Sequence, residues 1–322
     1  MQMKFLKKSN QSMQTIICQH CQRNTGHQLS TLPKVYRPSS VNTAKNIQTI
    51  ICQQATKLST TNYTRQMSST INPEELQKFR LLSQKWWDSR GDFAVLRAMN
   101  SLRIPLVRDG LKHTGIASLK ATLGPKPLDG LKILDVGCGG GLLCEPLARL
   151  GAIVTGIDPL QENIEVAKQH SAQDPQISGQ ITYLVSSVEE QVQNQPSYYD
   201  AVVASEVVEH VDNVEVFISS AVDLVKKGGS LFFTTVNRTW LSYVLAICIA
   251  EWGLRIVPRG THEWSKFIPP VNLKEQLESK NCHIQLLHGM CYNPVTRKWS
   301  WITDSSVNYA LHAVKLNETH TT

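Results

Sequence analysis

A cluster of glycines between an apolar stretch and a helical stretch constrains the fold of this chain more than any other feature. The cluster is Asp135-Val-Gly-Cys-Gly-Gly-Gly141, and the apolar residues 131–136 lead into it. Glycine allows the sharp turns and the close backbone approach that a bound ligand requires. In α/β folds the ligand lies at the carboxyl ends of the strands. The cluster therefore predicts a ligand-binding loop at the end of the first strand of a parallel sheet.

Apolar runs and helical stretches alternate along the chain after the turn cluster Pro125–Gly130. Such alternation is typical of βαβ units and a parallel sheet. We expect an α/β fold of the Rossmann type over residues 126–318, with a mostly parallel sheet and helices on both faces. The expected strands are 131–136, 152–157, 181–185, 200–204, 230–236, 283–287 and 308–314, and the expected helices are 142–150, 160–170, 214–225 and 273–279.

The N-terminal segment has a different composition from the rest of the chain. Residues 1–73 contain nine Lys or Arg and no Asp or Glu, which leaves 24 basic against 26 acidic residues in the remaining 249. A basic, acid-free segment rich in Ser and Thr is typical of a mitochondrial transit peptide. We expect residues 1–70 to be a cleavable leader processed near Arg65, and a disordered basic tail is the alternative. Because the net charge of +7 belongs to the leader, it gives no reason to expect a nucleic-acid partner.

A helical extension is expected between the leader and the sheet, over residues 71–125. Asn72 is a suitable N-cap and Pro73 favours the first turn of a helix. Glu75 lies three residues after Asn72, as in a capping box. The pattern predicts that residues 76–87 are helical.

An acidic residue at the end of the second expected strand indicates which ligand the glycine loop holds. There the Asp158 carboxylate can accept hydrogen bonds from both ribose hydroxyls of an adenosine. A dinucleotide loop would need a third glycine at position 142, where this chain has Leu142. S-adenosylmethionine has no pyrophosphate, and its ammonium suits a carboxylate such as Asp135. We expect S-adenosylmethionine as cofactor, bound by Asp135, Gly137, Gly139 and Asp158.

Around this loop, residues 134–141 resemble the first motif of the class I methyltransferases. Further motifs resemble the ubiquinone-biosynthesis O-methyltransferase family, and the similarity extends over about residues 75–315. These motifs are Trp86-Trp87-Asp88, Phe93-x-x-Leu96-x-x-Met99-Asn100-x-Leu102-Arg103, Ser205-Glu-Val-Val-Glu-His210, Pro258-Arg-Gly-Thr-His262 with Lys266-Phe-Ile268, and Tyr292-Asn-Pro294.

The resemblance implies a function that the residues alone do not give. It implies methylation of a hydroxyl on polyprenylated catechol precursors of ubiquinone, at two steps of the pathway, and other ubiquinone-biosynthesis proteins as partners. It also places cofactor contacts at Arg103, Gly137, Asp158 and Ser205. Bacterial relatives tend to have Met where this chain has Ser205, so we expect a backbone contact there.

Two carboxylates and an imidazole follow the fourth expected strand. If the turn is helical, the spacing of Glu206, Glu209 and His210 puts all three on one face. Two carboxylates with one imidazole can hold a divalent cation such as Mg²⁺, and the family resemblance favours this interpretation. The alternatives are His210 as a catalytic general base or His210 in a purely structural hydrogen bond.

An apolar insert, residues 238–268, interrupts the second half of the domain. Its stretch Trp240–Trp252 is too short to span a bilayer, which takes about 20 apolar residues. The stretch is either a core helix or a helix lying in a membrane interface. Because a polyprenyl substrate resides in the bilayer, we favour peripheral attachment to the matrix side of the inner mitochondrial membrane.

Two rival functions remain open from the sequence. The chain could be another class I small-molecule methyltransferase, such as a soluble catechol or amine methylator. Alternatively, it could be a non-catalytic scaffold subunit that binds S-adenosylmethionine. The apolar insert argues against the first, and the intact Asp135, Gly137, Asp158, Glu206 and His210 argue against the second.

Overall fold

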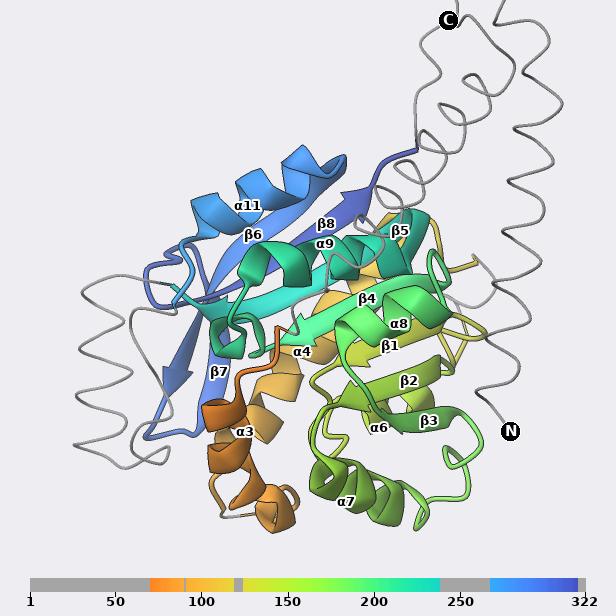
Figure 1. The fold of residues 1–322 in the computed structure, drawn as a ribbon, viewed down its shortest axis with the longest axis vertical. Coiled ribbons are helices and arrows are strands. Elements are labelled where there is room, and N and C mark those ends of the chain that lie inside the picture. The colour runs from red at the N-terminus through yellow and green to blue at the C-terminus, as the bar shows by residue number, and fades with distance from the viewer. Residues whose placement is uncertain (1–69, 90, 119–123, 238–266, 318–322) are drawn as a thin grey trace, which may run out of the picture. The chain divides into compact units, whose positions relative to one another are not determined.

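The computed structural model describes residues 70–89, 91–118, 124–237 and 267–317 (Figure 1). Within these residues, eight strands form one sheet in the order β3-β2-β1-β4-β5-β8-β6-β7. Strands β1 to β5 pair in parallel, whereas β8, β6 and β7 add an antiparallel edge beside β5. The strands are β1 Lys132–Val136, β2 Ile153–Asp158, β3 Ile181–Val185, β4 Tyr199–Ser205, β5 Val225–Val236, β6 Cys282–Asn293, β7 Lys298–Ile302 and β8 Asn308–Lys315.

Helices cover both faces of this sheet, as predicted for the Rossmann-type fold. Neighbouring strand residues alternate between two hydrophobic clusters, so Ile133 contributes to one face and Leu134 to the other. Helices α4, α6 and α7 pack on the Ile133 face, and α8, α9 and α11 pack on the Leu134 face. The described helices are α3 Pro73–Arg80, η2 Ser83–Lys85, α4 Ala94–His113, α6 Cys144–Arg149, α7 Gln161–Ser171, α8 Val188–Asn194, η3 Val208–His210, α9 Val214–Leu224 and α11 Pro270–Ser279.

The helical N-terminal region shares its core with the sheet. The buried face of α4 packs in the same cluster as Ile133 and Phe232. A Cβ built on Gly110 of α4 would lie 2.7 Å from the ring of Phe232, so a glycine is needed for the helix to approach the sheet this closely.

Three elements differ from the expectations. The helix predicted over 76–87 ends at Arg80, and a short 3₁₀ turn follows it. Helix α8 was not predicted, although Ser187 and Glu190 form the capping box that signals its start. Strand β7 was also missed, although it is the second strand of a local hairpin with β6 and its residues Trp299, Ser300 and Trp301 alternate between aromatic and polar side chains.

Residues 70–72, which precede α3, are hydrogen-bonded to the loop that follows β4. Ile71 forms an antiparallel bridge with Val211, and the Asp212 amide donates to the Thr70 carbonyl at 2.9 Å. Asn72 caps α3 with its side-chain oxygen, while its amide nitrogen donates to Asp212 at 2.6 Å. These bonds place α3 beside the carboxyl end of β4.

Two predicted segments cannot be compared with the structure. The leader up to residue 69 and residues 238–266 of the apolar insert lie outside the described part of the chain. The last two residues of the insert, Phe267 and Ile268, are buried. In the described ranges, no helix combines the length and apolarity that crossing a membrane requires.

Candidate active site

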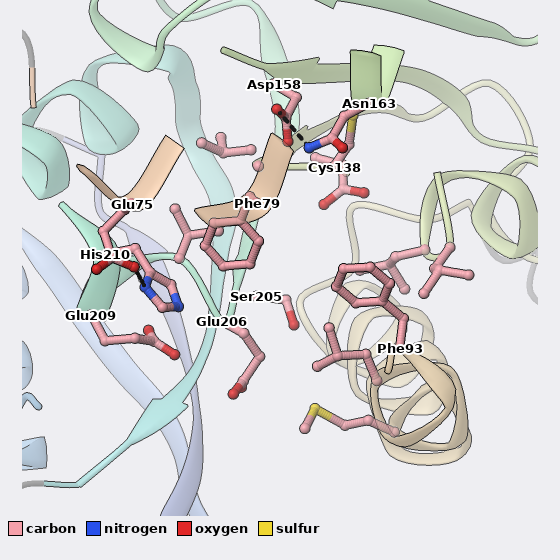
Figure 2. Close-up of a pocket in the computed structure, with 18 of the residues that line it drawn as sticks. Glu75, Phe79, Phe93, Cys138, Asp158, Asn163, Ser205, Glu206, Glu209 and His210 are labelled. Atoms are coloured by element: carbon pink, nitrogen blue, oxygen red, sulfur yellow. Dashed lines mark hydrogen bonds and ion pairs between the residues drawn. The ribbon is translucent and has the colours of Figure 1, made fainter. Parts of the chain in front are cut away.

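A cavity of about 640 Å³ opens at the carboxyl ends of β1, β2 and β4. The glycine loop, Asp158 and Ser205 line one part of it, and Glu206, Glu209 and His210 line another (Figure 2). The structure therefore brings every predicted site residue to one cavity except Gly139, which lies in the loop behind it. The volume of the cavity is within the range of small-molecule sites, about 300–1,000 Å³.

The Asp158 carboxylate holds the glycine loop against the end of β2. One carboxyl oxygen accepts the Gly139 amide at 3.0 Å, and the other accepts the Leu160 amide at 2.9 Å and the Asn163 side chain at 3.1 Å. Gly137, Gly139 and Gly141 have φ values of +67°, +53° and +84°, a region that favours glycine. The loop conformation thus depends on both its glycines and this carboxylate.

Two tryptophans from the N-terminal region close over the glycine loop. The Trp86 indole donates to Asn163 at 2.8 Å, and the Trp87 indole donates to the Gly140 carbonyl at 2.9 Å. A Cβ on Gly139 or Gly140 would lie 2.3–2.4 Å from Trp86. These two glycines are therefore required by tryptophan packing as well as by the turn. Both tryptophans belong to the Trp86-Trp87-Asp88 motif, but the motif alone does not reveal this packing role.

Arg103 reaches the end of β4 from α4 and is itself buried. Its guanidinium donates to the Ser205 hydroxyl at 2.8 Å and to Asn100 at 2.6 Å. The Ser205 hydroxyl also shares a hydrogen bond of 2.7 Å with Thr234. Protein partners therefore occupy the hydroxyl, and the backbone contact expected at Ser205 stays a prediction.

Burial raises the pKa values of the two carboxyl groups near the glycine loop. It raises the pKa of Asp135 to about 6, against the hydrogen bond from Cys144 and the charge of Arg103. It likewise raises the pKa of Asp158 to about 6, although three hydrogen bonds oppose the shift. A cationic ligand beside these groups would favour their ionised forms.

The loop after β4 carries the second group of predicted residues. Glu206 has φ +57°, a left-handed conformation that is strained for a non-glycine residue. The loop then makes the 3₁₀ turn of η3. The Glu209 carboxylate accepts the Thr235 hydroxyl at 2.7 Å, and His210 Nδ1 lies 2.9 Å from the Glu75 carboxylate.

Among these three side chains, Glu206 is the one with a buried polar atom that lacks a hydrogen bond to any described residue. Its Oε1 atom is buried and has no hydrogen-bond partner among the described residues. Burial and then the nearby Glu209 charge raise the pKa of Glu206 to about 7. Burial lowers the pKa of His210, but the hydrogen bond with Glu75 and the charges of Glu209, Glu75 and Glu206 together raise it above its usual value.

These side chains do not surround a common point. Nowhere in the described ranges are three or more His, Cys, Asp or Glu side chains arranged to hold a metal ion. Figure 2 nevertheless shows Glu206, Glu209 and His210 close together along one wall of the cavity. The carboxylate oxygens of Glu206 and Glu209 suit a hard divalent cation, and the unpartnered buried oxygen of Glu206 would gain most from one.

Comparisons with known proteins show which family the chain resembles. A family model described as a methyltransferase domain matches residues 111–287. "Ubiquinone biosynthesis O-methyltransferase, mitochondrial" from Rattus norvegicus is 50% identical over 77% of this chain and 71% of the relative. The Homo sapiens relative of the same name is 49% identical over 77% of this chain and 66% of its own length. "Ubiquinone biosynthesis O-methyltransferase" from Bradyrhizobium is 42% identical over 77% of this chain and 95% of the relative.

The matched domain and the glycine-loop site define a methyltransferase that depends on S-adenosylmethionine. With 50% and 42% of its aligned residues identical to the Rattus norvegicus and Bradyrhizobium relatives, the chain belongs to the ubiquinone biosynthesis O-methyltransferase family. This confirms the family that the sequence motifs indicated.

Replacing Asp158 with alanine should weaken S-adenosylmethionine binding. The substitution removes the proposed ribose acceptor and releases the Gly139 amide that the carboxylate holds. Loss of hydrogen bonds to a charged group costs about 1.5–3 kcal/mol, so titration calorimetry should show an affinity at least about tenfold lower. Glu165→Ala, on the exposed side of α7, is the control. Unchanged affinity in Asp158→Ala would refute the cofactor assignment.

Proposed function

We propose that this chain transfers the methyl group of S-adenosylmethionine to a phenolic hydroxyl of polyprenylated catechol precursors of ubiquinone, at both O-methylation steps. The observation that carries the proposal is the alignment with relatives named ubiquinone biosynthesis O-methyltransferase. This alignment covers 95% of the length of the Bradyrhizobium protein. The apolar part of the cavity supports it independently.

Beyond the predicted cofactor residues, the cavity is walled mainly by apolar side chains. They come from α3, α4 and the β6–β7 hairpin, which lie far apart in the sequence. An aromatic ring with a hydrocarbon tail is the kind of ligand that such a wall favours, because each buried CH₂ contributes about 0.8 kcal/mol. The side chains include Phe79, Leu96, Met99, Met290, Tyr292 and Trp299.

The cofactor end of the cavity suits the parts of S-adenosylmethionine. Asp158 is the proposed acceptor for the ribose hydroxyls, and Asp135 is the proposed partner of the ammonium. Gly137, Gly139, Arg103 and Ser205 complete the proposed cofactor contacts. The raised pKa values of Asp135 and Asp158 make both carboxyls responsive to the positive charge of this ligand.

Catalysis at this site requires alignment and deprotonation of the acceptor. The sulfonium methyl group is already electrophilic, so the protein must hold the phenolic oxygen in line with the departing sulfur. A phenol has a pKa of about 10, and little phenolate exists at neutral pH. The groups that we propose to act on that proton are Glu206, Glu209 and His210, which line the cavity.

In the favoured mechanism, Glu206, Glu209 and His210 would hold Mg²⁺. Such an ion, when bound, lowers the pKa of a coordinated hydroxyl and orients it. The unpartnered Glu206 oxygen and its raised pKa support the proposal. Glu209 would have to exchange its bond to Thr235 for the ion.

In the alternative mechanism, His210 is the general base. A base must be unprotonated, whereas the surrounding carboxylates raise the pKa of His210. His210 would therefore act as a base only at pH values above this raised pKa. The pH profile of activity should accordingly be centred above the ordinary histidine value of about 6.5.

We further propose a mitochondrial location, at the matrix side of the inner membrane. Eukaryotic relatives are named mitochondrial, and residues 1–73 have the composition of a transit peptide. Peripheral membrane attachment and contacts with other ubiquinone-biosynthesis proteins would bring the enzyme to its lipid-soluble substrate.

The first test is methyl transfer to catechols with and without a prenyl tail. Incubated with labelled S-adenosylmethionine, the chain should methylate a catechol carrying one prenyl unit with a kcat/KM at least about tenfold above that of bare catechol. The reason is burial of about five carbons in the apolar wall. Equal rates on both would support a soluble catechol methylator, and cofactor binding without any transfer would support a scaffold subunit.

The second test separates the metal from the general base. If Glu206, Glu209 and His210 bind Mg²⁺, excess chelator should abolish activity, added Mg²⁺ should restore it, and alanine at any one position should lower kcat at least about a hundredfold. If His210 is only a base, chelator should have no effect, and activity should fall as the pH drops below the raised pKa of His210. Full activity of stripped protein in chelator would exclude the metal.

The third test concerns the leader. Deleting residues 1–65 should abolish import into isolated mitochondria, because it removes all nine basic residues of the acid-free segment. Cofactor affinity should stay within about twofold, since the deletion leaves every residue around the cavity in place. Import of the shortened chain at the normal rate would contradict the leader assignment.

A further inference from the structure

Glu75 has no role in any of the functional assignments above, yet its side chain contacts the site directly. It lies in the first turn of α3, and its Oε2 atom lies 2.9 Å from Nδ1 of His210. Its side chain is only 8% exposed and that of His210 is 17% exposed. A carboxylate buried to this degree is normally retained only with a defined partner, and His210 is such a partner.

The contact determines which imidazole nitrogen faces the cavity. A carboxylate only accepts hydrogen bonds, so Nδ1 of His210 must carry the hydrogen. In the neutral ring Nε2 is then the nitrogen with the free electron pair. Figure 2 shows Glu75 on one side of His210 and the carboxyl groups of Glu206 and Glu209 on the other.

A second contact restricts the orientation of the ring. Phe79, one turn after Glu75 on α3, meets the His210 ring edge to face, with centroids 5.1 Å apart and planes at 87°. Helix α3 therefore holds the imidazole with both a hydrogen bond and an aromatic contact.

Other bonds already anchor α3 to the body of the protein. The Thr70 hydroxyl donates to Glu189 at 2.6 Å, Asn72 donates to Asp212 at 2.6 Å, and Ile71 bridges to Val211. Because these bonds do not involve Glu75, attachment of the helix does not by itself explain a buried carboxylate at this position.

We propose that Glu75 is a positioning residue, which fixes the tautomer and orientation of His210 so that Nε2 is presented to the acceptor end of the cavity. Carboxylates that hold the second nitrogen of a functional histidine are common in metal sites. The same contact serves His210 whether it binds a divalent ion or accepts a proton. The inference rests on the proposed role of His210 in methyl transfer.

The test compares four variants of the full chain. Glu75→Ala removes the contact, and Glu75→Gln retains an oxygen that can accept from Nδ1. Thr70→Val removes an anchoring bond of α3 without touching His210. Glu74→Ala changes the exposed neighbour in the same helical turn.

Kinetics and cofactor binding supply the first readouts. Glu75→Ala should lower kcat on a prenylated catechol by about 10- to 100-fold, the usual effect of losing such a supporting group. Its affinity for S-adenosylmethionine should change less than about twofold, because Asp158 and the glycine loop are untouched. Glu75→Gln should recover most of the rate, and Thr70→Val and Glu74→Ala should keep the parent rate.

The nitrogen signals of His210 supply a readout that needs no turnover. At pH 9, ¹⁵N NMR of the parent chain should show the tautomer with hydrogen on Nδ1, and Glu75→Ala should show a mixture of tautomers. An unchanged tautomer in Glu75→Ala, or an equal loss of kcat in Thr70→Val, would overturn the proposal. If the parent chain methylates no catechol, the proposed function fails, while the ¹⁵N signals still decide whether Glu75 positions His210.

Discussion

The hydrogen bond from the Gly139 amide to Asp158 joins the glycine loop to the end of β2. The other carboxyl oxygen of Asp158 holds Asn163, and Asn163 in turn accepts the Trp86 indole. One buried carboxylate thereby connects the first two strands, the start of α7 and the N-terminal extension. The cofactor end of the cavity keeps its shape because these contacts restrain the loop from both sides.

The opposite end of the cavity depends on a different attachment. Segment 70–72 pairs with residues 211–212, and α3 thereby reaches the loop that carries Glu206 and His210. The N-terminal extension therefore contributes to both ends of the site. It supplies tryptophans to the glycine loop and, through Glu75, a partner to His210.

Buried acids dominate the electrostatics of the cavity. Burial raises the pKa values of Asp135, Asp158 and Glu206 to about 6, 6 and 7. Arg103 is the cationic side chain beside them in the described part of the wall, and burial lowers its own pKa. A cavity with this excess of acids favours cationic ligands, which agrees with a sulfonium cofactor and with the proposed divalent ion.

The sequence alone determined the succession of strands β1 to β5 and of the helices between them except α8, the glycine loop, the family, and the positions of Asp158 and His210 along the chain. Local patterns suffice for these features, because apolar periodicity and glycine spacing act over a few residues. Only the tertiary structure decided the break after Arg80, the closure of Trp86 over Gly139, and the pairing of Glu75 with His210. The Glu75–His210 contact joins residues 135 positions apart. A local sequence pattern cannot predict this pair, because only the folding of the whole chain brings the two residues together.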